Sequence, residues 1–353
     1  MKSVNTSPAS DQSVFGTDHP CLVLAEIGIN HNGSIDLAKR MIDAAKASGA
    51  DAVKFQNYRT EDFLSDRTLT YDYVSQGKKV TESQWDMFKR YELDRAAVMA
   101  IARHCRDSGI LFSSTPTSVK GVAELREAGA AFLKNGSDFL MHLPLIAAMA
   151  QTGLPTVIST GMAMQDDVDD AVSAYRAAGG REMVLLHCVS AYPAPLDAMN
   201  LRRMQALAGT YDCPVGLSDH SEGVAAAAAA VAMGACIVEK HFTLDRNLPG
   251  PDHHFSSDPA ELAALVRAVR DAESMLGGVS IVPSKAETKA RDGYRLSCVA
   301  ARDLPAGATV TAADVQFRRP GTGLPPKAMA QLIGRKLSRT RKAGEPFGAD
   351  DVS

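Results

Sequence analysis

The feature that most constrains the fold is a series of eight short apolar stretches between residues 21 and 241, most of which end in a polar side chain. The first stretch is CLVLAEIG, at 21–28, and the last is CIVEKHFT, at 236–243. Segments with the apolar spacing of helices separate the stretches, so strands and helices alternate along the chain. This alternation predicts an α/β fold, a closed (β/α)8 TIM barrel in which the C-terminal ends of the strands form one mouth.

The length of the chain predicts a second domain, because such a barrel takes about 250 residues and this chain has 353. We predict a polar leader at 1–20, a catalytic barrel at 21–276, a linker at 277–295 and a small domain of short strands and turns at 296–353. The leader lacks the apolar run of a signal peptide, so we do not interpret it as an export signal.

Charge and composition narrow the classes of partner. The chain has 38 basic and 41 acidic residues and a net charge of −3, so neither sign predicts nucleic acid or an anionic membrane as a partner. The longest apolar run, at 224–238, is shorter than the roughly 20 residues that span a bilayer. The 6 cysteines form no Cys-x-x-Cys pair, which is typical of a reduced, cytoplasmic protein. A small-molecule ligand fits these properties best.

Two histidines stand at the ends of the last two strands, His220 in SDH and His241 in EKH. Neighbouring strands lie about 5 Å apart, so both imidazoles can reach one divalent cation in the mouth. A lone histidine is usually structural, but this pair favours the ligand interpretation. His187 is a candidate third ligand, although its apolar neighbours favour a packed side chain. His253 and His254 are expected in a solvated loop.

Two lysines, Lys54 and Lys134, lie inside strand patterns. A buried ammonium group is costly unless it meets an anion or loses its proton, so each lysine predicts an anion site or a Schiff-base amine. Hydroxyl groups at strand ends would add donors; they belong to Thr115, Ser137, Ser159 and Ser218. Glu26, at the end of the first strand, is a candidate general base or could orient a metal-bound water.

The segment from Asn57 to about Thr81 has no sustained apolar period and carries several aromatic residues among charges. It follows the C-terminal end of a strand, where long loops often cover an active site. We weigh two interpretations equally, an active-site lid and a packing insert.

Eight motifs in chain order together resemble the sialic acid synthase family: AEIGINHNG, GADAVKFQ, FSSTP, KNGSDF, PTVISTGM, HCVSAYPAP, GLSDHS and EKHFTLD. The later strings FRRPGTG, LIGRKL and KAGEP are similar to the small antifreeze-like (SAF) domain of that family. The resemblance implies a transferase that condenses phosphoenolpyruvate with N-acetylmannosamine or a related acetamido sugar. The products would be phosphate and a nine-carbon 2-keto sugar acid.

The resemblance also implies roles for individual residues. His220 and His241 would hold a divalent metal, Mn²⁺ first and Mg²⁺ or Co²⁺ as alternatives, and with Glu26 they would join Lys54 and Lys134 in the catalytic set. The phosphate and carboxylate of phosphoenolpyruvate would be bound by Lys54, Thr115, Lys134, Ser137, Ser159 and Ser218. The sugar or the reacting water would meet Glu26, Gln56, Tyr192 and Asp252. Glu239 is a further candidate for substrate binding. Arg319 would come from the partner subunit of a domain-swapped homodimer and contact the sugar's N-acyl group.

The chain departs from the family pattern in KNGSDF, where Asn135 replaces a small apolar residue and Phe139 replaces an acid that helps fix the sugar in some members. The acceptor therefore stays open between N-acetylmannosamine and diacetamido sugars that lead to legionaminic or pseudaminic acid.

A rival enzyme on the same fold is a Schiff-base pyruvate aldolase or lyase with Lys134 or Lys54 as nucleophile. The histidine pair argues against it, because a Schiff-base enzyme needs no metal. A second rival is a sugar-binding protein whose C-terminal domain is the working part and whose barrel is inert. The polar strand ends argue against that rival.

Overall fold

The structure is a computed structural model that describes residues 14–16 and 19–353. Most of the predicted leader, at 1–20, therefore lies outside the described residues. The chain divides into two compact units, Met1–Gly277 and Gly278–Ser353.

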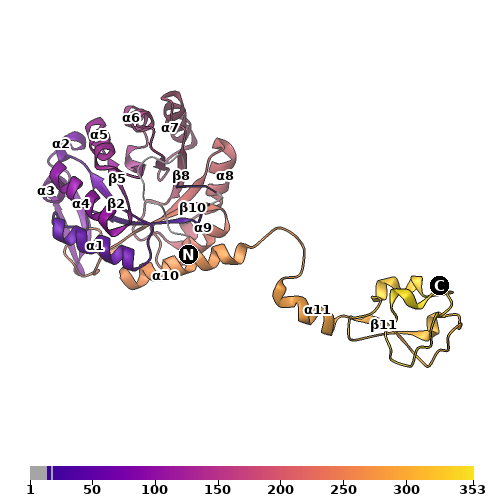
Figure 1. Ribbon diagram of the computed structural model, residues 1–353. Coiled ribbons are helices and arrows are strands. Elements are labelled where there is room, and N and C mark those ends of the chain that lie inside the picture. Colours follow the sequence, from indigo (N-terminus) through magenta and orange to yellow (C-terminus); the bar gives the residue numbers. More distant parts are fainter. Residues whose placement is uncertain (1–13, 17–18) are drawn as a thin grey trace. The chain divides into compact units, whose positions relative to one another are not determined.

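Eight parallel strands, all within the described residues, close into a barrel in the first unit (Figure 1). They are β1 (Leu22–Gly28), β2 (Ala52–Asn57), β5 (Leu111–Pro116), β6 (Phe132–Asn135), β7 (Thr156–Ser159), β8 (Met183–Cys188), β9 (Val215–Asp219) and β10 (Ala235–His241). The last strand pairs with the first, which closes the ring. The predicted barrel is confirmed.

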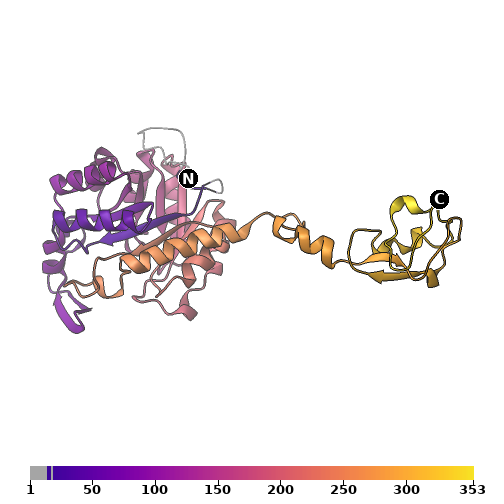
Figure 2. The ribbon, with the colours of Figure 1, turned by 60° about the horizontal axis from the view of Figure 1, so that its bottom comes forward.

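Helices cover the outside of this barrel. They are α1 (Ile35–Ala47), α4 (Arg95–Ser108), α5 (Val119–Ala128), α6 (Leu143–Gln151), α7 (Gln165–Ala177), α8 (Arg202–Tyr211), α9 (Ala225–Ala232) and α10 (Pro259–Leu276). In α10, Asp258 and Glu261 form a capping box at the N-terminus, and Leu262, Leu265 and Val269 form the buried stripe. This helix packs between α9 and α1 and so completes the ring of helices (Figure 2).

The segment that follows β2 has regular structure, although its sequence shows no sustained apolar period. It forms α2 (Thr60–Phe63), an antiparallel hairpin of β3 (Thr70–Ser75) and β4 (Lys78–Ser83), and α3 (Gln84–Tyr91). The hairpin turn is Gln76–Gly77, with φ of 52° and 74°. Two positive φ values suit the twist of a tight hairpin, but Gln is a rare residue there, so the sequence gives little warning of the turn.

The tip of the hairpin lies against the loop between β10 and α10. The backbone N–H of Gly250 donates to Ser75 Oγ at 3.1 Å, and Gln76 Nε2 donates to the carbonyl of Asn247 at 3.1 Å. The two interpretations of this segment, lid and packing insert, both remain compatible with these contacts.

The second unit begins inside the predicted linker with η4 (Lys285–Glu287) and α11 (Thr288–Tyr294). Its sheet pairs β11 (Ser297–Ala300) with β12 (Val315–Arg318). A short 3-10 helix, η5 (Ala312–Asp314), lies between these strands, and η6 (Pro326–Gln331) and η7 (Ala349–Asp351) follow them. A small core contains Cys298, Ala300, Leu304, Val310, Val315, Leu332, Leu337 and Phe347. The unit is therefore the domain of short strands and turns that the sequence predicts. Across all described residues, no helix has the length and apolarity to cross a membrane.

Candidate active site

The mouth of the barrel is polar because the inward-facing side chains change character along each strand. Side chains alternate between the two faces of a strand, and the deeper inward positions are apolar: Leu22, Leu24, Ala52, Phe132, Val157, Val184, Leu186 and Ile237. One step of two residues further on stand Glu26, Lys54, Lys134, Ser159, Cys188 and Glu239, all buried. The apolar layer thus forms a floor beneath a ring of polar groups.

Two lysines and two glutamates form one buried ionic network in this ring. Lys54 Nζ lies 2.9 Å from Glu26 Oε1 and 3.6 Å from Glu239 Oε2. Lys134 Nζ lies 3.6 Å from Glu239 Oε1. Each ammonium group thus meets a carboxylate, which offsets part of the large cost of removing the charges from water.

Hydroxyl groups join the network at its edges. Thr115 Oγ1 accepts from Lys54 at 3.3 Å, Ser159 Oγ accepts from Lys134 at 2.7 Å, and Ser218 Oγ donates to Glu239 Oε1 at 2.8 Å. Glu26 Oε2 and Glu239 Oε2 are buried and find no hydrogen-bond partner among the described residues. Buried carboxylate oxygens without donors indicate a site that is completed by a ligand or water.

The two glutamates differ in their proton affinity. Burial raises the pKa of Glu26 above its usual value, and the charge of Lys54 only partly opposes the effect. Burial acts on Glu239 too, but the ammonium groups of Lys134 and Lys54 outweigh it and hold its pKa below the usual value. Two carboxyl groups with divergent pKa values are typical of an acid/base group beside a permanent counter-ion. Glu26 is therefore the candidate for proton transfer.

The two lysines also differ. The carboxylates of Glu239 and Glu26 outweigh burial and raise the pKa of Lys54. Burial dominates at Lys134 and lowers its pKa, despite the nearby Glu239.

His220 and His241 face each other at the rim, with ring centroids 5.4 Å apart. His220 Nδ1 donates to the carbonyl of Val189 at 2.8 Å, so Nε2, which lies 3.5 Å from Ser218 Oγ, is the nitrogen that can meet a ligand. Within residues 14–16 and 19–353, the buried His241 Nδ1 has no hydrogen-bond partner, and it lies 3.9 Å from Asp252 Oδ2. Burial, with the charges of His220 and Lys54, holds the pKa of His241 well below its usual value, so the ring stays in the neutral form that binds metals.

The described residues contain no group of three or more His, Cys, Asp or Glu side chains that could hold a metal ion. The histidine pair nonetheless fits a cation in its donor chemistry, because His241 stays neutral and each ring has a nitrogen that a ligand can reach. Burial lowers the pKa of His220, but its contacts with Cys188, Val189 and Glu239 outweigh burial and raise it, so a bound cation would have to displace a proton from that ring. Substrate or water would have to supply the remaining ligands, as in catalytic rather than structural metal sites.

An aromatic wall flanks the histidines. The ring of Tyr192 lies 4.2 Å from that of His220, and the ring of Phe255 lies 4.9 Å from Tyr192 and 5.1 Å from His241. Asp252 shares this corner, and burial raises its pKa to about 6. The corner combines ring faces with a carboxyl group, a pattern that suits a sugar.

Comparison with known proteins identifies the family. The model of the NeuB family matches residues 41–280, and that of the SAF domain matches residues 297–353. The chain belongs to the NeuB family. It is 38% identical over 333 residues to the N,N'-diacetyllegionaminic acid synthase of Legionella pneumophila, covering 93% of this chain and 94% of the relative. It is 35% identical to the N-acetylneuraminate-9-phosphate synthase of Mus musculus, covering 91% of this chain and 90% of the relative.

A solved structure agrees with the sequence relatives. The N-acetylneuraminic acid (sialic acid) synthetase of Leptospira borgpetersenii, in complex with citrate, has a TM-score of 0.70 and 34% identity to this chain. The match covers 78% of this chain and 92% of that one. The resemblance to the sialic acid synthase family and the predicted fold class, a TIM barrel followed by a SAF domain, are confirmed.

The structure places the predicted site residues of this NeuB-family chain at the barrel mouth, with the exception of Arg319. Gln56 Nε2 donates to Glu26 Oε1 at 3.5 Å, and Ser137 Oγ, in η1 (Ser137–Phe139), accepts from the backbone N–H of Gly161 at 3.0 Å. Arg319 belongs to the second unit, where its guanidinium group lies 5.2 Å over the ring of Tyr294. The roles of these residues stay predictions.

The side chains of three other histidines form hydrogen bonds outside the barrel mouth. His187 Nε2 donates to the carbonyl of Met199, just after η2 (Leu196–Ala198), at 2.5 Å, which supports a packed residue rather than a ligand. His253, in η3 (His253–Phe255), is 0% exposed, so the expectation that it is solvated is wrong. Its ring lies between Thr243 Oγ1, which contacts Nδ1 at 2.7 Å, and Asn32 Oδ1 in the turn after β1, which contacts Nε2 at 3.3 Å. His254 is half-buried and donates to the carbonyl of Pro251.

Some residues of the mouth are missing from the sequence prediction. Cys188 Sγ lies 3.9 Å from His220 Nδ1, and its inward position follows from the two-residue step after Leu186. The sequence does not indicate that Phe255 lies at the mouth, because this residue belongs to a loop without an apolar period. Phe139, one of the departures from the family pattern, lies 6.3 Å from the ring of Phe63 and extends the aromatic surface near η1.

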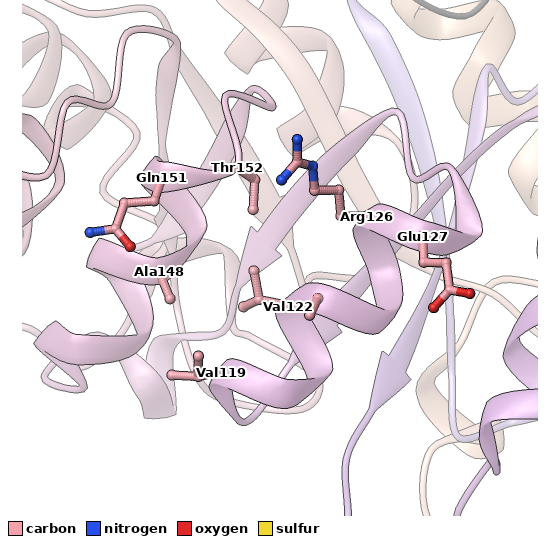
Figure 3. A pocket seen from close by; sticks show the side chains of 8 residues that line it. Val119, Val122, Arg126, Glu127, Ala148, Gln151 and Thr152 are labelled. Carbon is pink, nitrogen blue, oxygen red and sulfur yellow. The ribbon is translucent and has the colours of Figure 1, made fainter.

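A separate hollow of about 520 Å³ lies between α5 and α6 on the outer face of the barrel (Figure 3). Its lining consists of Val119, Val122, Ala123, Arg126, Glu127, Ala148, Gln151 and Thr152. This lining includes none of the predicted site residues and has no candidate nucleophile or metal ligand apart from Glu127. The chemistry therefore gathers at the mouth and not in this hollow.

Proposed function

We propose that this protein condenses phosphoenolpyruvate with an acetamido sugar, releasing phosphate and forming a nine-carbon 2-keto sugar acid. One observation carries the proposal: in a NeuB-family chain, two buried lysines, two buried glutamates and a histidine pair converge at one barrel mouth. Relatives named N,N'-diacetyllegionaminic acid synthase and N-acetylneuraminate-9-phosphate synthase support the same reaction class.

Phosphoenolpyruvate carries two anionic groups, and the mouth offers two ammonium groups to receive them. Lys54 and Lys134 lie on opposite sides of Glu239, 3.6 Å from one oxygen each. A bound phosphate and carboxylate would take over part of this pairing and would meet the hydroxyl groups of Thr115 and Ser159 beside the lysines. Ser137 and Ser218 would add further donors.

His220 and His241 would hold a divalent cation, for which we propose Mn²⁺, with Mg²⁺ or Co²⁺ as alternatives. When bound, the cation would supply Lewis-acid polarisation of the open-chain aldehyde of the sugar. Gln56, Tyr192 and Asp252 would bind the rest of the acceptor, because they surround the histidines with hydrogen-bonding groups and a ring face.

The carbon–carbon bond forms when C3 of phosphoenolpyruvate attacks the aldehyde carbon. The positive charge left at C2 is quenched by water, and Glu26 accepts the proton that the water loses. The resulting tetrahedral carbon expels phosphate by cleavage of its C–O bond and becomes the keto carbon, and the proton of its hydroxyl group leaves with the phosphate. The proton held by Glu26 passes to the alkoxide oxygen that the aldehyde became. Lys54 and Lys134 stabilise the phosphate as its charge grows.

The acceptor is N-acetylmannosamine or a diacetamido sugar. Identity to a relative named for N,N'-diacetyllegionaminic acid, at 38%, supports the diacetamido class. The aromatic surface around Phe139 and Phe63 supports it as well, because a second acyl group brings an apolar methyl where a hydroxyl would otherwise lie.

We also propose a cytoplasmic homodimer in which Arg319 of one copy reaches the mouth of the other. The loops that follow β6, β7 and β8 expose large apolar side chains on the mouth side: Met141, Met162, Met164 and Leu196 are 53% to 72% exposed. Apolar surface of this kind is typical of a face that another chain covers. The cysteines of the described part, Cys21 included, are free, as expected in a reducing compartment.

Phosphate release from phosphoenolpyruvate tests the reaction. We expect release that requires both a sugar and a metal ion, measured with N-acetylmannosamine and, separately, with diacetamido sugars, in Mn²⁺ and in excess chelator. No release with any sugar in metal-replete protein would contradict the proposal. Borohydride trapping of pyruvate on the protein, with activity retained in chelator, would instead favour the Schiff-base lyase.

A further inference from the structure

Asn30 lies in the turn between β1 and α1, outside the set of residues expected to meet substrate, and is 1% exposed. Its side-chain Nδ2 donates two hydrogen bonds, to the carbonyl of Phe242 at 2.9 Å and to Ser256 Oγ at 3.0 Å. Phe242 directly follows His241. The first bond therefore holds the backbone at the end of β10, where one of the two facing histidines stands.

The second bond reaches the acceptor corner. Ser256 Oγ donates in turn to the backbone carbonyl of Asp252 at 2.6 Å. One carboxamide thus connects the residue after His241 with the backbone of Asp252, across the loop that runs from 242 to 258. The side chains of His241 and Asp252 lie 3.9 Å apart on the mouth side of that loop.

The same turn holds this loop at other points. His253 Nε2 donates to Asn32 Oδ1 at 3.3 Å, and Asn32 Nδ2 donates to the carbonyl of Pro249 at 2.8 Å. Because these bonds fix the middle of the loop, Asn30 has a more specific effect than keeping the loop folded. It adds a side-chain link between the end of β10 and Asp252, beside the backbone bonds from Phe242 N–H to the carbonyl of Glu26 and from Ser257 N–H to the carbonyl of His241.

The arrangement has an energetic cost. Asn30 Oδ1 is buried, and no partner for it occurs in the part of the chain that the structure describes. A buried acceptor without a donor destabilises the folded state, because it loses its bond to water and gains none in return. An apolar residue would avoid that cost, so the two donated bonds must matter to the geometry they hold.

We propose that Asn30 is a positioning residue that holds His241 and Asp252 in the arrangement needed to bind the cation and the acceptor sugar together. The inference rests on the proposed function, because that function assigns His241 to the cation and Asp252 to the acceptor.

The test compares three variants of the full-length protein. Asn30→Asp keeps the size of the side chain but removes both donated bonds. Ser256→Ala removes only the branch toward Asp252. Asn200→Asp is the matched control, because Asn200 is exposed and its amide donates to the carbonyl of Ala198. Circular dichroism and thermal unfolding verify that each variant folds, and calorimetry measures Mn²⁺ affinity separately from turnover.

Loss of a hydrogen bond that a metal ligand itself makes typically weakens metal binding by about 10–100-fold. Asn30 acts one residue away, through the carbonyl of Phe242, so we expect Asn30→Asp to weaken Mn²⁺ binding by about 10-fold, the lower end of that range. The KM of the acceptor should rise, and the KM of phosphoenolpyruvate should change little. Ser256→Ala should raise the KM of the acceptor and leave Mn²⁺ affinity near that of the wild type. Asn200→Asp should change neither quantity.

Unchanged Mn²⁺ affinity and unchanged acceptor KM in a folded Asn30→Asp protein would overturn the inference. If that variant does not fold, an unchanged acceptor KM in Ser256→Ala overturns it instead. A wild type that releases no phosphate would show that the proposed function itself has failed, and the inference would fall with it.

Discussion

Lys54 Nζ lies 2.9 Å from Glu26 Oε1 inside the barrel, and the two side chains are 5% and 2% exposed. The same ammonium group lies 3.6 Å from Glu239. Lys54 therefore stands between two carboxyl groups whose pKa values are displaced in opposite directions, upward at Glu26 and downward at Glu239. Glu26 can therefore exchange a proton, whereas Glu239 keeps its negative charge.

The role of Glu26 predicts the effect of Glu26→Gln. The amide keeps the shape of the side chain but cannot accept a proton, so kcat should fall by about 10²–10⁴-fold, the usual contribution of a general acid or base. Binding of phosphoenolpyruvate should persist, because Lys54 and Lys134 remain. Steady-state kinetics and calorimetry measure the two effects. A kcat close to that of the wild type would exclude Glu26 as the base.

A buried ion pair on the outer side of the strands predicts a large loss of stability. Lys240 Nζ lies 2.8 Å from Asp219 Oδ2, with side chains 3% and 0% exposed. Lys240→Met leaves a buried carboxylate unpaired, which typically costs about 3–5 kcal/mol in the free energy of unfolding.

The matched control is Arg95→Met, which removes the exposed ion pair with Glu127. Exposed pairs contribute about 0–1 kcal/mol. Urea unfolding followed by fluorescence of Trp85, the single tryptophan of the chain, compares the two variants. Equal losses in both would contradict the assignment of the Lys240–Asp219 pair to the interior.

The SAF domain should lose stability in acid. Hydrogen bonds from the hydroxyl and backbone N–H of Thr311 hold the pKa of Asp314 below its usual value. At Asp351, bonds from Arg341, Gly348 and Arg339 outweigh burial and lower the pKa as well. Because unfolded Asp titrates near pH 4, this stabilisation is complete above about pH 4 and is lost as the pH falls through the folded pKa values.

Amide hydrogen exchange of residues 297–353 in the full chain measures this loss. Asp351→Asn should destabilise the domain at neutral pH and flatten its response to acid. Asp350→Asn, at an exposed neighbouring position, should leave the response unchanged. A wild-type domain whose exchange rates show no acid-induced opening would contradict the prediction.

Removal of the metal should stop turnover, but phosphoenolpyruvate should still bind. We expect excess chelator to abolish activity and Mn²⁺ to restore it, because the aldehyde then regains its Lewis acid. His241→Ala should lose Mn²⁺ binding yet still bind phosphoenolpyruvate, whose contacts come from Lys54 and Lys134. Calorimetry with each ligand separates the two sites. Full activity of metal-free protein would refute the metal assignment.

The sequence predicts the barrel and much of its mouth because both depend on local patterns. Lys54 and Lys134 are conspicuous as charges inside apolar strands, and the two-residue step along a strand turns them inward. His220 and His241 follow neighbouring strands, so their approach requires only the strand order of a barrel. Each of these inferences uses residues close together in the chain.

Other features depend on partners far away in sequence. The two bonds of Asn30 reach residues 212 and 226 positions later, and no local pattern announces them. The β3–β4 hairpin is short, with half of its residues exposed and none buried, so it lacks the buried apolar face that marks a strand. The sequence places His253 in a loop. Its burial could not be predicted, because it depends on the turn after β1, which His253 contacts only in the folded chain.

Cleavage of phosphoenolpyruvate that carries ¹⁸O in the bridge between C2 and phosphorus distinguishes the proposed condensation from other routes of phosphate release. The substrate is incubated with Mn²⁺ and each acetamido sugar, and the phosphate is analysed by mass spectrometry together with the sugar acid. We expect a nine-carbon acid formed in equal amount with phosphate that keeps the ¹⁸O, because water attacks C2 and the C–O bond breaks. Phosphate without the label, or no phosphate with any sugar, would contradict it.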